Sequence, residues 1–349
     1  MTLDRISRLQ RQLAPGQLFY ISNLINIRYL TGFTGSNAAL LVTEDNAVFA
    51  TDSRYEIQAN IQVPDLQTLI GRNFPELLLS KAEKSEVLVE GNHLSINSFK
   101  SIESNFPHQL KISTGLVEKL RAVKDDAEIN LIKSACEIST QSFLDLLPTI
   151  KVGQSEKEIR DALEQRFREF GADDIAFESI VASGPNSAIP HHEPTDRKVA
   201  AGDFLKIDFG AKLGGYHSDC TRTVVVGKPA DWQRELHAAV TQAQTAGRNT
   251  ICADIKFAEV EDSVNDALVA SGYREYFTHG LGHGVGLEIH EDPFFGRVQD
   301  AKIASNTVIT IEPGAYLKEK GGVRVEDTIV VNSEGYLNLT NLPYELLEL

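Results

Sequence analysis

The spacing of hydrophobic residues outlines a first part of the chain built from short strands and helices. Four apolar positions between Leu3 and Leu13 recur at helical spacing, with arginines between them. Short runs rich in β-branched and aromatic residues then predict strands at 18–22, 38–43, 47–52 and 86–91. Weaker helical patterns cover 55–59 and 97–105. Because strands alternate with helices, residues 1–117 are predicted to form a small α/β domain.

Residues 118–349 contain the same order of elements twice. Asp125 and Glu128 have capping-box spacing at the start of a helix that extends to about residue 147, and Ser155 and Glu158 repeat the device. The second helix ends at Gly171 and has an apolar stripe of Ile159, Leu163, Phe167 and Phe170. A strand, a loop and a hairpin over 203–226 follow. Helices at 232–247 and 258–271 and a hairpin over 308–331 then predict a second αα-ββ half around a shared centre.

Each of the two predicted hairpins presents a pair of acidic residues. A turn at Leu213-Gly214 places Asp208 directly opposite Asp219, and Glu312 and Glu326 are mirror images about Glu319. Like charges directly opposite each other destabilise a strand pair, so a positive charge is expected between them. For one hairpin alone, a surface ribbon with solvated acids is an equal alternative, and a shared proton is another way to relieve the repulsion.

A histidine segment lies between the hairpins, with His279, His283 and His290 in the run THGLGHGVGLEIHE. Glycine at every second position from 280 to 286 leaves one face bare, so that a substrate or another backbone can approach. Four carboxylates and an imidazole form an oxygen-rich ligand set that suits hard divalent ions such as Mn²⁺. Two such ions balance four carboxylates with one hydroxide left as nucleophile, which is the logic of metal-assisted hydrolysis.

Composition narrows the class of protein. The chain has 349 residues and a net charge of −15, which argues against nucleic acid and anionic membrane surfaces as partners. Three cysteines without CxxC spacing indicate free thiols rather than a disulfide framework. With neither a signal peptide pattern nor an apolar run of about 18 residues, a cytoplasmic protein is expected.

Several sequence runs are similar to the signature segments of a known family. SGPNSAIPHH, DFGAKLGGYHSDCTRT, HGLGHGVGLEIHE, IEPGAY and GVRVEDT resemble those of the aminopeptidase P, Xaa-Pro dipeptidase and methionine aminopeptidase superfamily. NIRYLTGFTGSNA and TDSRY resemble the creatinase-type N-terminal domain of its proline-specific branch. The resemblance implies a creatinase-like domain followed by a pseudo-two-fold pita-bread catalytic domain, an α/β (α+β) fold.

The resemblance also implies roles for individual residues. Asp208 would bind the first metal, Asp219 and Glu326 both metals, and His283 and Glu312 the second. Glu312 would also hold the bridging hydroxide and act as general base. His191 would stabilise the tetrahedral intermediate, and His290 is the second active-site histidine. Manganese is the expected ion, with cobalt, zinc and iron as alternatives, and a homodimer is implied.

Residue spacing adds two expectations and leaves one residue without a role. His279, four residues before His283, is expected either to face the substrate or to contact a metal ligand. Arg324 shares a strand face with Glu326 and is expected to orient a carboxylate. His192 is expected to be a loop surface residue.

The resemblance predicts an Xaa-Pro aminopeptidase acting on peptides with proline at the second position. A strict Xaa-Pro dipeptidase (prolidase), the alternative, must bind a free carboxylate just after proline. In some dipeptidases of the family an arginine follows the His-Glu pair three residues on. This chain has Phe294 there, which cannot bind an anion, so the aminopeptidase is favoured, although Arg297 lies nearby and could substitute. A metal-free hydrolase or a binding module of the same fold is the more distant alternative, although such proteins usually lack the metal ligands.

Overall fold

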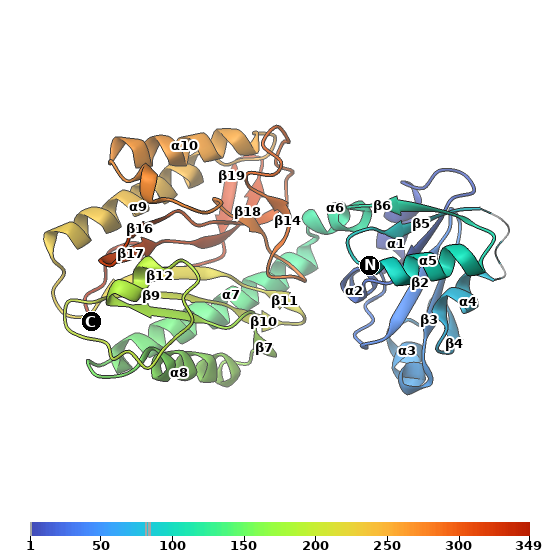
Figure 1. Ribbon diagram of the computed structural model, residues 1–349, viewed down its shortest axis with the longest axis horizontal. Coiled ribbons are helices and arrows are strands. Elements are labelled where there is room, and N and C mark those ends of the chain that lie inside the picture. Colours follow the sequence, from blue (N-terminus) through green and yellow to red (C-terminus); the bar gives the residue numbers. More distant parts are fainter. Residues whose placement is uncertain (1, 81, 83–84) are drawn as a thin grey trace. The chain divides into compact units, whose positions relative to one another are not determined.

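The computed structural model describes residues 2–80, 82 and 85–349, and the chain divides into two compact units, residues 1–121 and 122–349 (Figure 1). The boundary predicted after residue 117 lies within helix α6, Leu116–Ala122. None of the helices in these described ranges combines the length and apolar composition needed to cross a membrane.

The first unit is built on a mixed six-stranded sheet in the order β4-β3-β2-β1-β5-β6. Its strands are β1 (Leu18–Ile21), β2 (Ala38–Val42), β3 (Ala47–Thr51), β4 (Gln67–Ile70), β5 (Glu86–Glu90) and β6 (Gln109–Ser113). Its other helices are α1 (Thr2–Gln10), α2 (Leu24–Thr31), α3 (Glu56–Gln62), α4 (Phe74–Leu79) and α5 (Ile96–Asn105), with a 3₁₀ turn η1 (Ser53–Tyr55). The central strands β1 and β2 are buried along their whole length, which explains their continuous apolar runs.

The second unit begins with two helices that cover the first pair of small sheets. Helix α7 starts at the predicted capping box of Asp125 and Glu128, and α8 starts at that of Ser155 and Glu158. The stripe of α8 is buried at Ile159, Leu163 and Phe167, whereas Phe170 caps the helix and is 42% exposed, contrary to the prediction. The elements of this half are α7 (Asp126–Leu146), η2 (Leu147–Thr149), α8 (Glu156–Glu169), β7 (Asp174–Ile175), β8 (Ile180–Ser183), η3 (Gly184–Ala188), β9 (Phe204–Phe209), β10 (Ala211–Leu213), β11 (Tyr216–His217) and β12 (Cys220–Val225).

The second half repeats the order, with two helices before a group of strands. Figure 1 shows α9 and α10 along one side of this unit and α7 and α8 along the other, with the strands between them. The elements are α9 (Asp231–Thr250), α10 (Phe257–Ala270), η4 (Arg274–Tyr276), β13 (His283–Gly284), β14 (Glu291–Phe294), β15 (Val308–Ile311), β16 (Gly314–Leu317), β17 (Gly321–Arg324), β18 (Asp327–Asn332) and β19 (Gly335–Asn338). This repeat confirms the predicted pita-bread arrangement of the second unit.

The register of the first acidic hairpin differs from the prediction by two residues. Its turn is at Gly214-Gly215, both with positive φ, as a two-residue type I′ turn requires. Asp208 therefore pairs with Thr221 instead of Asp219. Because side chains alternate with a period of two, a shift of two residues keeps both aspartates on the same face, as diagonal neighbours.

The register of the second hairpin is as predicted. Strands β15 and β18 pair Ile311 with Asp327, and β16 and β17 pair Gly314 with Arg324, so Glu312 and Glu326 lie opposite each other between the two ladders. The two halves meet here, because the Glu326 amide donates to the Thr221 carbonyl oxygen at 3.1 Å. Both acidic pairs thereby reach the centre of the unit.

Candidate active site

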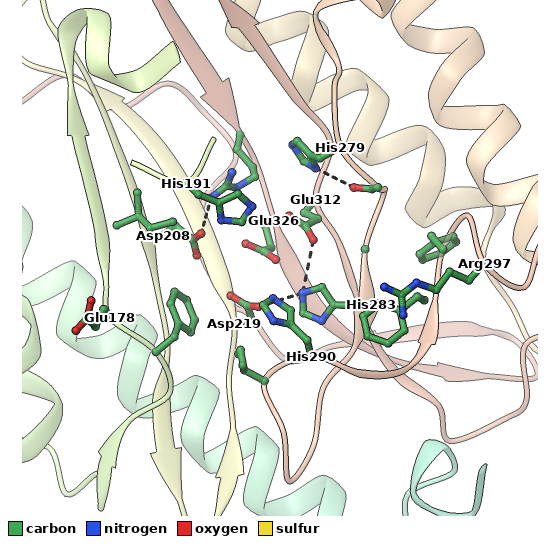
Figure 2. Close-up of a pocket in the computed structure, with 18 residues that line it drawn as sticks. Glu178, His191, Asp208, Asp219, His279, His283, His290, Arg297, Glu312 and Glu326 are labelled. Carbon is green, nitrogen blue, oxygen red and sulfur yellow. Dashed lines mark hydrogen bonds and ion pairs between the residues drawn. The ribbon is translucent and has the colours of Figure 1, made fainter. Parts of the chain in front are cut away.

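A pocket of about 600 Å³ opens at the meeting point of the two halves (Figure 2). Figure 2 shows histidines gathered around the carboxylates, with Arg297 to one side of His283. The lining includes every predicted site residue: His191, Asp208, Asp219, His279, His283, His290, Glu312, Arg324 and Glu326. The structure therefore places residues from both hairpins, the histidine segment and the 183–195 loop in one cavity.

The carboxylates and histidines lie close enough to share metal ions. Oxygen atoms of Asp208, Asp219 and Glu326 lie within 4.8 Å of one another, and the same holds for ligand atoms of His283, Glu312 and Glu326. A third group combines Asp219 with His283 and His290. Asp219, His283 and Glu326 thus belong to two groups each.

Glycines of the histidine segment allow the backbone to pack against its neighbours, as predicted. A Cβ atom at Gly282 would lie 2.1 Å from the Thr310 carbonyl oxygen, and one at Gly284 would lie 2.6 Å from that of Asp292. The segment is therefore pressed onto β15, which fixes the position of His283.

Burial strongly affects the protonation of the carboxylates. It raises the pKa of Asp219 and Glu312 well above the ordinary range, and nearby Glu326 raises both further. Burial, followed by the charge of Asp208, raises the pKa of Glu326 from 4.5 to about 8. Without added positive charge, the site holds protons that exposed carboxyl groups would release.

His283 presents a lone pair to these acids. Its Nδ1 lies 3.0 Å from the Gly284 carbonyl oxygen, which can only accept a hydrogen bond and so fixes Nδ1 as the donor. Burial, with nearby His290, lowers its pKa to about 4, so Nε2 is unprotonated at neutral pH. That nitrogen lies 3.5 Å from an Asp219 oxygen and 3.6 Å from a Glu312 oxygen. A proton on one of the carboxyl groups or a cation between them relieves the contact of this lone pair with the two oxygens.

Arg324 connects the two acidic pairs, in agreement with the expectation that it orients a carboxylate. Its Nη2 donates to Asp208 Oδ2, and its Nε donates to Thr221 Oγ1 at 3.0 Å. The Thr221 hydroxyl in turn donates to Glu326 Oε2 at 2.6 Å. One buried guanidinium thus orients Asp208 directly and Glu326 through a hydroxyl.

His279 lines the pocket and is held from behind. Its Nε2 lies 2.8 Å from the Tyr316 hydroxyl, which also accepts a hydrogen bond from Arg324 Nη1 at 3.0 Å. Burial and the charge of Arg324 lower the pKa of His279 to about 4, so the ring is neutral. Tyr316 was missed by sequence reasoning, although it lies in the IEPGAY run.

His192 differs from the prediction. It is 8% exposed, and its Nε2 lies 2.8 Å from the carboxylate of Glu156, so it is not a surface residue. Its neighbour His191 is exposed and faces the pocket. No pattern in the sequence indicates this burial, because the partner Glu156 lies 36 residues earlier.

Comparison with known proteins gives the family. Residues 130–333 match metallopeptidase family M24, and residues 5–123 match the creatinase/prolidase N-terminal domain. The chain belongs to metallopeptidase family M24. An Xaa-Pro dipeptidase of Pyrococcus furiosus is 32% identical, with 94% of each chain covered.

Solved structures of the M24 family resemble the whole chain. An Xaa-Pro dipeptidase from Bacillus anthracis is 35% identical, with a TM-score of 0.96 and all of both chains covered. An X-Pro aminopeptidase from Thermotoga maritima MSB8 is also 35% identical, with a TM-score of 0.91, covering 98% of this chain and all of the other. The mixed α/β fold, with a creatinase-like domain before the pita-bread domain, is therefore established.

The residues present fit the divalent cations on which the M24 family depends. Asp208 Oδ1 is buried and has no hydrogen-bond partner among the described residues, as expected of an oxygen that serves as a ligand. The unprotonated His283 nitrogen and the raised pKa values of the carboxyl groups also fit a site for divalent cations. Cations would be held by carboxylate oxygens and one imidazole, a set typical of hard or borderline divalent metals.

The raised carboxyl pKa values predict how pH changes the stability of metal-free protein. Glu326 keeps a proton in the folded chain up to about pH 8, whereas the unfolded chain releases it near 4.5. The folded state therefore binds more protons, and its stability falls as pH rises through this window. The lowered pKa values of buried His279 and His283 make stability rise with pH, but only below about pH 6.5.

Between pH 6.5 and 8 these histidines no longer contribute, and a carboxyl group that stays protonated in the folded state costs up to about 1.4 kcal/mol per pH unit. The lowered pKa of buried Lys206 acts in the opposite direction, but the raised carboxyl groups outnumber it. We expect the unfolding temperature of chelator-treated protein to fall over this range, and saturating Mn²⁺ to reduce the fall. Glu326→Gln should give a shallower decline. A flat or rising curve for the metal-free protein would contradict this account.

Proposed function

We propose that the chain hydrolyses the Xaa-Pro bond of dipeptides, with two divalent cations held by Asp208, Asp219, His283, Glu312 and Glu326. The observation that carries the choice of substrate is the placement of Arg297, which lines the same pocket as these ligands. Its guanidinium lies 4.2 Å from the centre of the Phe294 ring. Arg297 is exposed and forms no ion pair with the described residues, so it is available to a substrate carboxylate.

The relatives support the dipeptidase over the aminopeptidase favoured by the sequence argument. Proteins from Pyrococcus furiosus and Bacillus anthracis with identities of 32% and 35% are Xaa-Pro dipeptidases. That argument gave most weight to Phe294, which cannot bind an anion. Phe294 and Arg297 both line the pocket and contact each other, which supports the proposal that Arg297 supplies the cation that Phe294 cannot.

Two cations held by these residues would supply Lewis acidity and would lower the pKa of a bound water, so that it could act as nucleophile at neutral pH. Asp219 and Glu326 are the two carboxylates that belong to two ligand groups each, and they would hold both ions. His283 also belongs to two groups, but it has one free nitrogen and would hold one ion. Glu312, whose pKa is raised by burial and by Glu326, is placed to accept the proton of the attacking water. His191 would donate a hydrogen bond to the oxygen that gains negative charge, and His290 would contact the substrate from the other side of the pocket.

An X-Pro aminopeptidase is the second candidate function. The structure from Thermotoga maritima, which covers nearly the whole chain, supports it. Exposure of Arg297 supports it as well, because the pocket is open at this wall. A metal-free hydrolase is disfavoured because all five ligand residues converge. A homodimer, a cytoplasmic location and manganese as the native ion stay predictions, which sedimentation, cell fractionation and metal analysis test.

The roles of the two pocket histidines predict that His191→Ala and His290→Ala retain both cations but lose turnover. Loss of one electrostatic contact to a transition state costs about 10²-fold in rate or more. Metal content by mass spectrometry and kcat on an Xaa-Pro dipeptide measure the two effects separately. His290 also belongs to one possible ligand group, so a loss of metal in His290→Ala would reassign it as a ligand.

A further inference from the structure

A fully buried carboxylate at the start of α8 accepts an unusual number of hydrogen bonds. Glu156 is 0% exposed, and six donors converge on its two oxygens. Oε1 accepts from the Ser183 amide at 2.7 Å, the Ser183 hydroxyl at 2.8 Å and the Asn186 side chain at 3.0 Å. Oε2 accepts from His192 Nε2 at 2.8 Å, the Thr195 amide at 2.9 Å and the Thr195 hydroxyl at 2.7 Å.

These donors come from the two ends of one segment. Ser183 and Asn186 lie at the beginning of residues 183–195, and His192 and Thr195 lie at the end. Each oxygen holds one end, so the carboxylate closes the segment into a loop whose ends are fixed on α8. The segment carries His191, which faces the pocket, while Glu156 itself does not line that pocket.

His192 links the carboxylate to the direction of His191. The two neighbouring side chains lie on opposite sides of the chain, one buried and the other exposed. Fixing the ring of His192 inside therefore directs His191 outward. The middle of the segment is held independently, because the buried Lys206 ammonium donates to the carbonyl oxygens of Ile189 at 2.6 Å and Pro190 at 3.2 Å.

Only an ionised carboxylate can accept from all six donors, because a protonated carboxyl group carries an O–H that would face one set of donors. Burial opposes ionisation, but the hydrogen bonds from Thr195, His192 and Asn186 lower the pKa of Glu156 to about 2. The position at the first turn of α8 also favours negative charge. A glutamine at this position has one oxygen and one NH₂ group. The NH₂ group would face the three donors at one end of the segment, which it cannot accept from, and that end would be released.

We propose that Glu156 is a positioning residue for the peptidase reaction, which acts by clamping both ends of residues 183–195 and so fixing His191 at the pocket. This inference rests on the role proposed for His191. Glu156 lies outside the pocket, so it has no contact with substrate and acts through the segment alone.

The test compares Glu156→Gln with Glu158→Gln, a matched change two residues along the same helix. Glu158 caps the start of α8 and accepts hydrogen bonds from Ser155 and Lys198, but its side chain forms none with residues 183–195. Hydrogen exchange of this segment is measured on both metal-loaded variants. We expect faster exchange of the Ser183 and Thr195 amides in Glu156→Gln, and wild-type exchange in Glu158→Gln.

Kinetics in two backgrounds show whether the effect passes through His191. A misplacement of about 1 Å costs up to about 10²-fold in rate, so kcat of Glu156→Gln should fall about 10- to 10²-fold with unchanged metal content. In the His191→Ala background the same substitution should change kcat less than about twofold, because the positioned group is already gone. Thr195→Val, which removes one of the six donors, gives a milder form of the same result if Glu156→Gln does not fold.

Unchanged exchange in the segment would overturn the proposal whatever the activity. An equal loss of kcat in the wild-type and His191→Ala backgrounds would overturn it too, because Glu156 would then act by another route. Normal turnover of His191→Ala would instead contradict the role given to that histidine under the proposed function. Exchange would still decide whether Glu156 orders the segment.

Discussion

Asp219→Ala is expected to leave the protein folded but without either divalent cation and without measurable peptidase activity. Asp219 belongs to two of the three possible ligand groups, which supports the proposal that its carboxylate would hold both ions. Removing one shared ligand weakens both sites. A cation contributes several kcal/mol to the stabilisation of transition-state charge, so kcat should fall by at least about 10³-fold.

Metal content and thermal unfolding separate this effect from misfolding. Without cations, Asp219→Ala should unfold at a temperature equal to or higher than that of the wild-type protein, because it removes a buried carboxyl from a cluster of acids. Asp174→Ala, at an exposed strand position, is the matched control and should retain both ions. Full metal occupancy with near-normal turnover in Asp219→Ala would show that the ligand assignment is wrong.

The two acidic hairpins show what sequence periodicity can determine. For Glu312 and Glu326, both the shared sheet face and the pairing of the two residues agree with the prediction, because one continuous register extends across both pairs of strands. For Asp208 and Asp219 the face was correct and the register was not. The Gly214-Gly215 pair is the signal that was undervalued, since a two-residue turn with two positive φ angles favours glycine at both positions.

Short, exposed elements of the first unit were not predicted. Strands β4 and β6 form the edges of its sheet and are largely exposed, so their sequences lack a buried apolar run. Helices α2 and α4 have eight and six residues, too few for a clear helical period. The sheet centre, by contrast, was predicted because burial on both faces requires apolar residues.

Contacts between distant parts of the chain limited the prediction of the site. Motif positions placed every proposed ligand in the pocket, yet the hydrogen bonds of Tyr316 to His279 and of Glu156 to the 183–195 segment join residues 37 and at least 27 positions apart. Neither Tyr316 nor Glu156 stands in a pattern that indicates its partner. The contact of Arg297 with Phe294 was equally hard to predict, because it depends on the path of the chain after β14.

Arg297→Ala is expected to lower kcat/KM for an Xaa-Pro dipeptide while leaving the same dipeptide with an amidated C-terminus unaffected. A hydrogen bond between charged groups contributes about 1.5 to 3 kcal/mol, so the loss should be about 10- to 10²-fold. The amidated substrate has no carboxylate for the guanidinium to bind. Arg234→Ala, which removes the same charge from an exposed site on α9, is the matched control and should change neither value.

Peptide length gives the complementary measurement. For the wild-type protein, extending the dipeptide by one residue moves the carboxylate away from proline and should lower kcat/KM, because Arg297 then has no anion at the correct distance. In Arg297→Ala the preference for the dipeptide should disappear. If the wild-type protein instead prefers the longer peptide and Arg297→Ala affects all substrates equally, the chain is an Xaa-Pro aminopeptidase. The set of metal ligands would be the same in either enzyme, because the two activities differ in what lies beyond proline and not at the bond that is cleaved.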